Sequence, residues 1–125
     1  MMERVSTDRA PAAAGPYSQA IVDGGLAYVS GQIPVDPATG KVPEGIADQA
    51  RQALTNVRSV LEAAGSSMAD ALKVTVYITD MASFPEVNAV YGEFFSEPYP
   101  ARSCIGASAL PKGVKIEIDA VARVR

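Results

Sequence analysis

Two charged residues near the C-terminal end of the chain lie in segments that are otherwise typical of strands. Arg102 begins the apolar and small segment "RSCIGASAL", and Glu117 stands between Ile116 and Ile118. A guanidinium has five donors in a planar fork and can bind a carboxylate through two parallel hydrogen bonds. A partly sheltered carboxylate can have its pKa raised and accept a proton from water. The pair could therefore bind an anionic substrate and activate water, although either residue alone is more often a surface charge on an amphipathic strand.

The residue types that the chain lacks restrict its chemistry further. It contains no histidine and a single cysteine, Cys104. The Ser-His-Asp and Cys-His nucleophile pairs are therefore excluded, and no zinc or other metal site is expected. No glycine-rich phosphate loop is present. Proton chemistry must then depend on Asp, Glu, Tyr, Lys or Cys.

The composition indicates one domain over residues 1–125. The chain has 48% hydrophobic and 20% charged residues and a formal net charge of −3. Such a chain is long enough to bury its own core, and its acidic balance argues against nucleic acid or an anionic membrane as partner. No apolar run reaches the roughly 18 residues that a membrane span requires, and the first residues lack the apolar segment of a signal peptide. The single cysteine is typical of a reducing compartment, so a cytoplasmic location is expected.

The pattern of apolar residues predicts seven elements in the order β-β-α-β-α-β-β. Strands are expected at 17–22 and 26–30, joined by a glycine-containing hairpin turn, and further strands at 72–79, 102–108 and 114–124. A helical stripe runs from Ile46 to Ala64, and Gly65 suits its C-terminal cap. A second helix is expected from Ser83, where Ser83 and Glu86 resemble a capping box, to the prolines of "EPYP".

Two helices can cover only one face of the sheet, which predicts an α+β two-layer fold. Alternation in the middle strand places Leu72, Val74, Val76 and Ile78 under the helices, and the last strand contributes Ile116, Ile118, Ala120 and Ala122. The second face would carry Glu117, Asp119, Val121, Thr75 and Tyr77, and we expect Cys104 there, with Arg102 two residues earlier on the same side. The proximity of Arg102 is expected to lower the pKa of the Cys104 thiol, provided that the thiol is not deeply desolvated. This mixed face is either a half-solvated surface or an interface with further copies of the chain around a ligand.

Three segments resemble the reactive-intermediate deaminase family (RidA, the Rid/YjgF group). They are "APAAAGPYSQAI", "VSGQIPVDPATG" and "PARSCI…LPKGVKIEI". The C-terminal motif of the family is matched in order by Pro100, Ala101, Arg102, Ser103, Ile105, Leu110, Ile116, Glu117 and Ile118. The resemblance extends from Thr7 to Val124.

The resemblance implies a chorismate-mutase-like fold, a homotrimer with clefts between subunits, and no cofactor or metal. It also implies hydrolysis of 2-imino acids (2-aminoacrylate, 2-iminobutanoate), the enamine and imine products released by pyridoxal-phosphate dehydratases, to 2-keto acids and ammonia. Residue by residue, the carboxylate-binding arginine of the family matches Arg102 and its water-orienting glutamate matches Glu117. The remaining pocket residues match Tyr17, Ser30, Gly31, Asn88 and Cys104. Gly106 stands where many relatives have a bulkier residue, which bears on the shape of the pocket.

The sequence leaves two other functions possible. Some members of the family are described as ribonucleases or inhibitors of translation, although this chain has no basic patch or aromatic run for stacking on RNA. A non-catalytic sensor could instead bind small keto or amino acids through Arg102. Salt dependence of RNA binding and turnover assays distinguish these alternatives from a deaminase.

Overall fold

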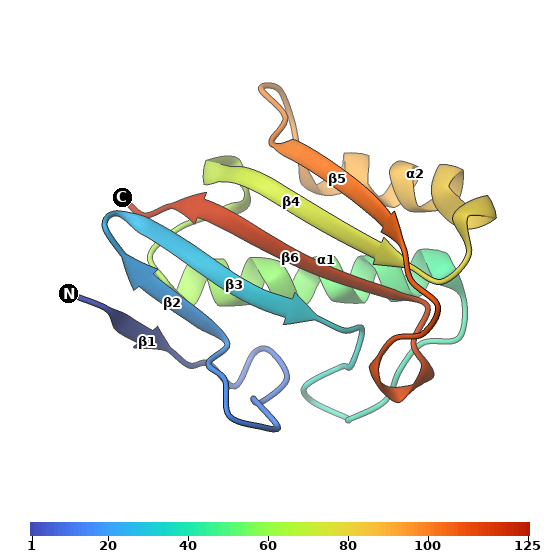
Figure 1. Ribbon diagram of the computed structural model, residues 1–125, viewed down its shortest axis with the longest axis horizontal. Helices are drawn as coiled ribbons and strands as arrows, with labels where there is room; N and C mark the ends of the chain where they lie inside the picture. The colour runs from blue at the N-terminus through green and yellow to red at the C-terminus, as the bar shows by residue number, and fades with distance from the viewer.

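The computed structural model describes residues 1–125 and contains one six-stranded sheet with two helices on one face (Figure 1). The strands are β1 (Glu3–Val5), β2 (Ala20–Asp23), β3 (Leu26–Gln32), β4 (Ala71–Ile78), β5 (Ala101–Gly106) and β6 (Ile116–Arg123). The helices are α1 (Ile46–Ala63) and α2 (Phe84–Phe94), with short 3-10 turns η1 (Met68–Asp70), η2 (Met81–Ser83) and η3 (Pro111–Gly113). The order across the sheet is β1-β2-β3-β6-β4-β5, and only β4 and β5 run parallel. The predicted α+β class with a mixed sheet is confirmed.

The predicted element order is right for the seven elements that follow β1, but it omits β1 itself. This strand has only three residues and pairs with β2, with Glu3 opposite Val22. Three residues are too few to display alternation, so the sequence carried no strand signal there. The next strand also starts later than expected, at Ala20, because Tyr17 belongs to a tight turn in which its backbone N–H donates to the Gly15 carbonyl.

Turn and cap residues fix the ends of several elements. The predicted glycine-containing hairpin between β2 and β3 is present. Its turn has two residues, Gly24 and Gly25, with φ of 60° and 79°. Gly65 ends α1 with φ of 81°, and its N–H donates to the Glu62 carbonyl while the N–H of Ser66 donates to the Leu61 carbonyl. This pair of bonds is the Schellman cap that the glycine predicted.

The capping box predicted at Ser83 does not form. The Ser83 hydroxyl donates to the Asp80 carbonyl, and the Ser83 backbone is already helical. The Asp80 carboxylate instead accepts from the N–H of Ala82 and caps η2, which leads directly into α2. The preceding 3-10 turn therefore takes over the role of the cap.

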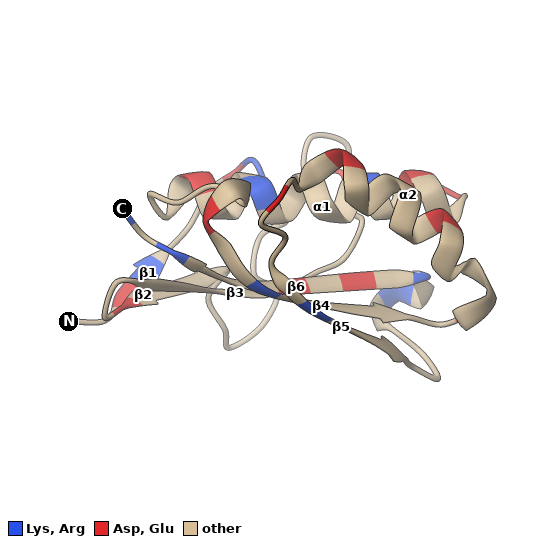
Figure 2. Ribbon diagram, turned by 90° about the horizontal axis from the view of Figure 1, so that it is seen from above, with Lys and Arg blue, Asp and Glu red and all other residues tan.

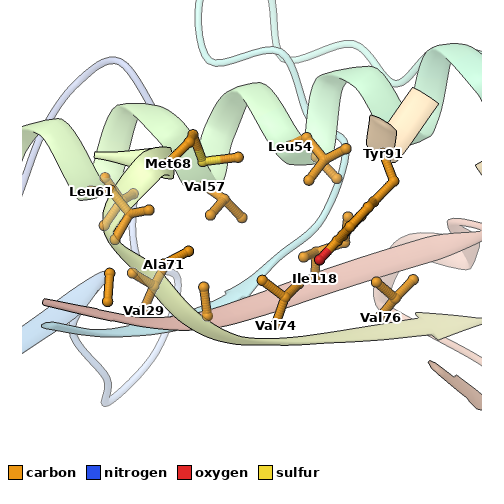
Figure 3. Close-up of a cluster of buried hydrophobic side chains, with 14 of the residues drawn as sticks. Val29, Leu54, Val57, Leu61, Met68, Ala71, Val74, Val76, Tyr91 and Ile118 are labelled. Atoms are coloured by element: carbon orange, nitrogen blue, oxygen red, sulfur yellow. The ribbon is translucent and has the colours of Figure 1, made fainter. Parts of the chain in front are cut away.

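The core lies between the two helices and the face of the sheet that they cover (Figure 3). Leu54, Val57 and Leu61 of α1 are fully or almost fully buried against the inward side chains of β4 and β6. The inward residues of β6 are Ile116, Ile118, Ala120 and Ala122, as the alternation predicted.

The prediction for Leu72 is wrong, since 38% of its surface is exposed and the preceding Ala71 is buried in its place. The pairing of β4 with β6 shifts register between Ala71 and Lys73. This irregularity reverses the alternation for one residue at the start of the strand.

The side of the sheet away from the helices, which we call the open face, is covered by no other element (Figure 2). Tyr28 of β3 and Ile105 of β5 lie there with 47% and 45% of their surfaces exposed, and Tyr28 pairs with Val121 of β6. Neither helix of the chain combines the length and the apolar character that crossing a membrane would require.

Candidate active site

Arg102 lies on the helix side of the sheet. It occupies the edge strand β5 and pairs in register with Val74 of β4, which is fully buried under the helices. Cross-strand partners share a face, so the Arg102 side chain points toward α2. There its Nη1 donates a hydrogen bond of 2.7 Å to Oδ1 of Asn88.

Three residues of α2 surround the guanidinium, and we call Phe84, Asn88 and Tyr91 the Arg102 cradle. The guanidinium carbon lies 5.2 Å from the ring centroid of Phe84 and 4.7 Å from that of Tyr91. Positions i, i+4 and i+7 share one face of a helix, which is why these three side chains meet the same group. A cavity of about 460 Å³ opens beside Arg102 and is also lined by Gly92, Tyr99 and Pro100.

Arg102 has no carboxylate partner within the chain. None of the ion pairs in the structure includes it, whereas Arg51 binds Glu93 at 3.0 Å and Arg125 binds Asp70 at 2.7 Å. Its one side-chain hydrogen bond uses a neutral amide and leaves most of its donors available. The arrangement is therefore suited to binding an anion beside α2.

Cys104 pairs with Val76 and packs against the core under the helices, so the expectation that it lies on the open face is wrong. Cys104 does lie on the same side of the sheet as Arg102, as expected. The expected activation of its thiol is also wrong, because burial raises the pKa of Cys104 by more than the neighbouring Arg102 lowers it. The thiol is accordingly expected to be weakly reactive.

Glu117 lies on the open face. It pairs with Tyr77 of β4, whose hydroxyl donates a 3.0 Å hydrogen bond to the carboxylate of Asp119 on the same face. Partial burial raises the pKa of Glu117, and the negative charge of Asp119 raises it further. A carboxylate with a raised pKa is suited to take a proton from water near neutral pH.

A bulge in β3 contains the expected Ser30 and Gly31, and Gly31 lies next to Glu117. Val29 pairs with Ala120 and Gln32 with Ile118, so two residues of β3 stand opposite one residue of β6. A Cβ at Gly31 would overlap the carboxylate of Glu117. The absence of a side chain at Gly31 is what allows the carboxylate to lie against the strand.

The other expected residues on this side hold the loop before β2. The Ser30 hydroxyl donates a 2.6 Å hydrogen bond to the Ser18 carbonyl, and the Tyr17 hydroxyl accepts from the N–H of Ala14. A small cavity of about 80 Å³ is lined by Tyr17 and Gly31 together with Lys112. Lys112, whose φ of 57° is left-handed, was not singled out from the sequence, because nothing in its local pattern marks it.

The expected site residues thus form two groups on opposite faces of one chain. Arg102, Asn88 and Cys104 lie on the helix side, and Glu117, Gly31, Ser30 and Tyr17 gather on the other. Sequence reasoning missed Phe84 and Tyr91, whose rings contact Arg102. The spacing 84, 88 and 91 could have indicated this contact.

Comparison with known proteins identifies the family. The family model described as endoribonuclease L-PSP matches residues 7–124. The chain belongs to the L-PSP family. It is 50% identical over 125 residues to the 2-iminobutanoate/2-iminopropanoate deaminase of Escherichia coli K12, with 98% of each chain covered. The predicted resemblance to the RidA group is therefore confirmed.

Solved structures of L-PSP relatives have the same fold. The structure of Escherichia coli TdcF with bound serine is 47% identical and superimposes with a TM-score of 0.94 over 98% of this chain and 99% of that one. RidA from the Antarctic bacterium Psychrobacter sp. PAMC 21119 is 43% identical, with a TM-score of 0.95 over 98% and 99% of the two chains. The chorismate-mutase-like fold that the sequence predicted is thereby supported for this L-PSP chain.

Proposed function

We propose that this chain hydrolyses reactive 2-imino and enamine acids to 2-keto acids and ammonia. The observation that carries the proposal is the combination of an arginine without a carboxylate partner and a glutamate with a raised pKa in a member of the L-PSP family. The full-length 50% identity to a named imine deaminase supports the same reaction. The serine bound to TdcF is a small amino acid with a carboxylate, which is the kind of group that Arg102 would bind.

In the proposed mechanism the Arg102 guanidinium binds the substrate carboxylate and so positions the carbon of the C=N bond. Glu117 takes a proton from a water molecule as the water oxygen bonds to that carbon, which gives a 2-amino-2-hydroxy acid. Glu117 then returns the proton to the nitrogen. As the C–N bond breaks, Glu117 takes the hydroxyl proton, a 2-keto acid forms and ammonia leaves. Glu117 finally passes this proton to the departing ammonia, which is released as ammonium. A protonated imine is electrophilic already, so no covalent nucleophile takes part.

The placement of the two groups on opposite faces of the sheet favours a site formed between copies of the chain. We propose a homotrimer in which the Arg102 side of one copy meets the Glu117 side of another, so that each cleft contains both. The uncovered apolar side chains of the open face, Tyr28 and Ile105 among them, support an interface between copies. Sedimentation at micromolar concentration should give a trimer, and a monomer would contradict this assembly.

Mixing two inactive variants tests whether the sites are shared between copies. Arg102→Met and Glu117→Gln should each be inactive alone. Co-expressed, they should regain about a quarter of the parent rate, because one cleft in four would receive a native arginine from one copy and a native glutamate from the next. No recovery in confirmed mixed assemblies would mean that each site is built within a single chain.

Turnover itself can be tested by competition with a chemical trap. A dehydratase generates 2-aminoacrylate in the presence of semicarbazide, which captures the imine. The parent chain should reduce the yield of the captured adduct in proportion to its concentration, and Glu117→Gln should not. A chain that binds 2-ketobutyrate but leaves the adduct yield unchanged would be a sensor.

An RNA-cleaving function is the second candidate, because the matching family model is described as an endoribonuclease. Figure 2 shows Lys and Arg interspersed with Asp and Glu, and the net charge of −3 does not favour binding to phosphates. Cleavage of labelled RNA that is lost in Arg102→Met would support this candidate. RNA binding should weaken steeply with salt if phosphate contacts carry it.

Residues 1–125 would act as one domain in the cytoplasm, where a lone cysteine such as Cys104 remains a free thiol. The substrates would come from pyridoxal-phosphate dehydratases, whose elimination reactions release enamines and imines. Acting on such substrates requires no nucleic acid and no membrane as partner.

A further inference from the structure

We propose that Phe84 and Tyr91 are positioning residues that hold the guanidinium of Arg102 for a substrate carboxylate without neutralising its charge. The inference rests on the proposed role of Arg102 in binding that carboxylate. It assigns a function to two aromatic side chains that otherwise belong to the core face of α2.

The geometry of the Arg102 cradle carries this inference. Both ring centroids lie within 5.2 Å of the guanidinium carbon, which is inside the range of cation–π attraction. The third contact is the 2.7 Å hydrogen bond from Nη1 to Oδ1 of Asn88. Since Oδ1 accepts this bond, the amide NH₂ of Asn88 remains a donor for a ligand as well. The group therefore offers free donors and a positive charge to whatever enters the cavity.

Three other arginines of the chain, Arg9, Arg51 and Arg125, are paired with carboxylates. Arg51 is bound by both carboxylate oxygens of Glu93, and Arg125 by Asp70. An arginine paired in this way has already satisfied the charge and the donors that a substrate carboxylate would use. Aromatic faces and a neutral amide restrict the rotamers of Arg102 in advance, and a group ordered before binding loses less entropy when the ligand arrives.

The hydroxyl of Tyr91 does not contribute to this role. It is the buried side-chain polar atom that has no hydrogen-bond partner, and in Figure 3 it points toward Ile118 and the sheet. The ring, not the hydroxyl, contacts Arg102. Tyr91→Phe should therefore preserve the cradle and serve as the conservative variant that rescues binding.

The alternative is that these rings only pack the core and do not position Arg102. A matched variant at Phe95 distinguishes the two roles. Tyr91 is only 6% exposed and stacks on Phe95 with centroids 4.5 Å apart. Phe95 is equally buried, at 7% exposed, yet it makes no cation–π contact with Arg102. Phe95→Leu thus removes a comparable aromatic ring from the same part of the core and leaves the cradle in place.

The test measures binding of 2-oxobutanoate and of its uncharged amide, 2-oxobutanamide, by calorimetric titration. Tyr91→Leu and Phe84→Leu should each weaken binding of the carboxylate by about 5- to 10-fold, the scale of one partly desolvated cation–π contact, and leave the amide unaffected. KM for the imine should rise with little change in kcat. Tyr91→Phe and Phe95→Leu should bind like the parent. Phe84 is less buried than Tyr91, so its replacement should disturb folding less. If Tyr91→Leu does not fold, the result for Phe84→Leu therefore tests the inference.

Equal weakening of the carboxylate and the amide would overturn the inference, because it would indicate a deformed cavity. Unchanged binding in both leucine variants would overturn it as well. Arg102→Met distinguishes failure of the positioning role from failure of the proposed role of Arg102. If Arg102→Met weakens binding of 2-oxobutanoate while the leucine variants do not, only the positioning role is wrong. If Arg102→Met binds like the parent, the proposed role of Arg102 is wrong and the inference falls with it.

Discussion

The backbone of Gly31 lies directly against the carboxylate of Glu117, so closely that a single Cβ at position 31 would overlap the carboxylate carbon. The bulge at Ser30 and Gly31 creates this approach, because it places an extra residue of β3 opposite β6. The atoms in the way are the far end of a flexible side chain and not backbone. An added methyl group would therefore displace the carboxylate and leave the strand itself in place.

Gly31→Ala should consequently reduce activity with little loss of stability. We expect kcat to fall at least about 10-fold, since a catalytic group moved by even an ångström loses much of its effect. The midpoint of urea unfolding should stay close to that of the parent. Gly45→Ala is the matched control, because a Cβ at Gly45 would have no neighbour within 4 Å. A severely destabilised Gly31→Ala variant would show that β3, and not the carboxylate, had to move.

Glu117→Gln should separate catalysis from folding. The amide keeps the size of the side chain but cannot accept a proton, so the rate should fall by roughly 100-fold. Binding of 2-oxobutanoate should survive because Arg102 is unchanged. Equal loss of binding and rate would instead make Glu117 a structural part of the cleft.

The stability of Glu117→Gln relative to the parent should also depend on pH. Because the pKa of Glu117 is raised in the folded chain, the folded state binds more protons than the unfolded state between the ordinary pKa and the raised one. The parent therefore loses stability as pH rises through this window, and Glu117→Gln does not. Urea unfolding at fixed protein concentration should show the variant gaining relative stability from about pH 4 toward neutrality. A constant difference would mean that the pKa of Glu117 is not shifted by folding.

The sequence predicted those features that depend on local pattern. Alternation located the inward face of β6, and Gly65 marked the end of α1, since both are properties of a single segment. Local pattern could not predict on which face of the sheet Arg102 and Cys104 lie. Strand β5 is an edge strand with no fully buried residue, so its own alternation is weak, and its register against β4 decides which side chains face α2. The proposed sharing of each site between two copies is even further beyond the reach of any single-chain pattern.

Cys104 should react slowly with thiol reagents and should not be required for the reaction. Burial raises the pKa of its thiol, so little thiolate is present near pH 7. The reaction with an aromatic disulfide should be slower than that of glutathione at pH 7 and should accelerate only in more alkaline solution. Cys104→Ser should keep most of the parent rate. A thiol faster than glutathione, or an inactive but folded serine variant, would restore a chemical role for Cys104.

Asp119 should set the pH at which activity is lost in acid. Its negative charge is the second cause, after burial, that raises the pKa of Glu117. Asp119→Asn removes the charge and still offers an oxygen to the Tyr77 hydroxyl. The pKa of Glu117 should then fall, and Glu117 would remain ionised and able to accept a proton at lower pH. The acidic limb of kcat/KM should therefore move to lower pH in Asp119→Asn.

Tyr77→Phe is the control for this shift, because it removes the hydrogen bond to Asp119 and leaves the charge beside Glu117. Its acidic limb should not move to lower pH, since losing a donor does not reduce the negative charge that Glu117 experiences. The profiles of the parent and both variants, measured with one substrate, distinguish the effect of charge from that of geometry. If Asp119→Asn and the parent lose activity at the same pH, the group that titrates in the acidic limb is not Glu117, and the base of the reaction must be sought elsewhere in the cleft.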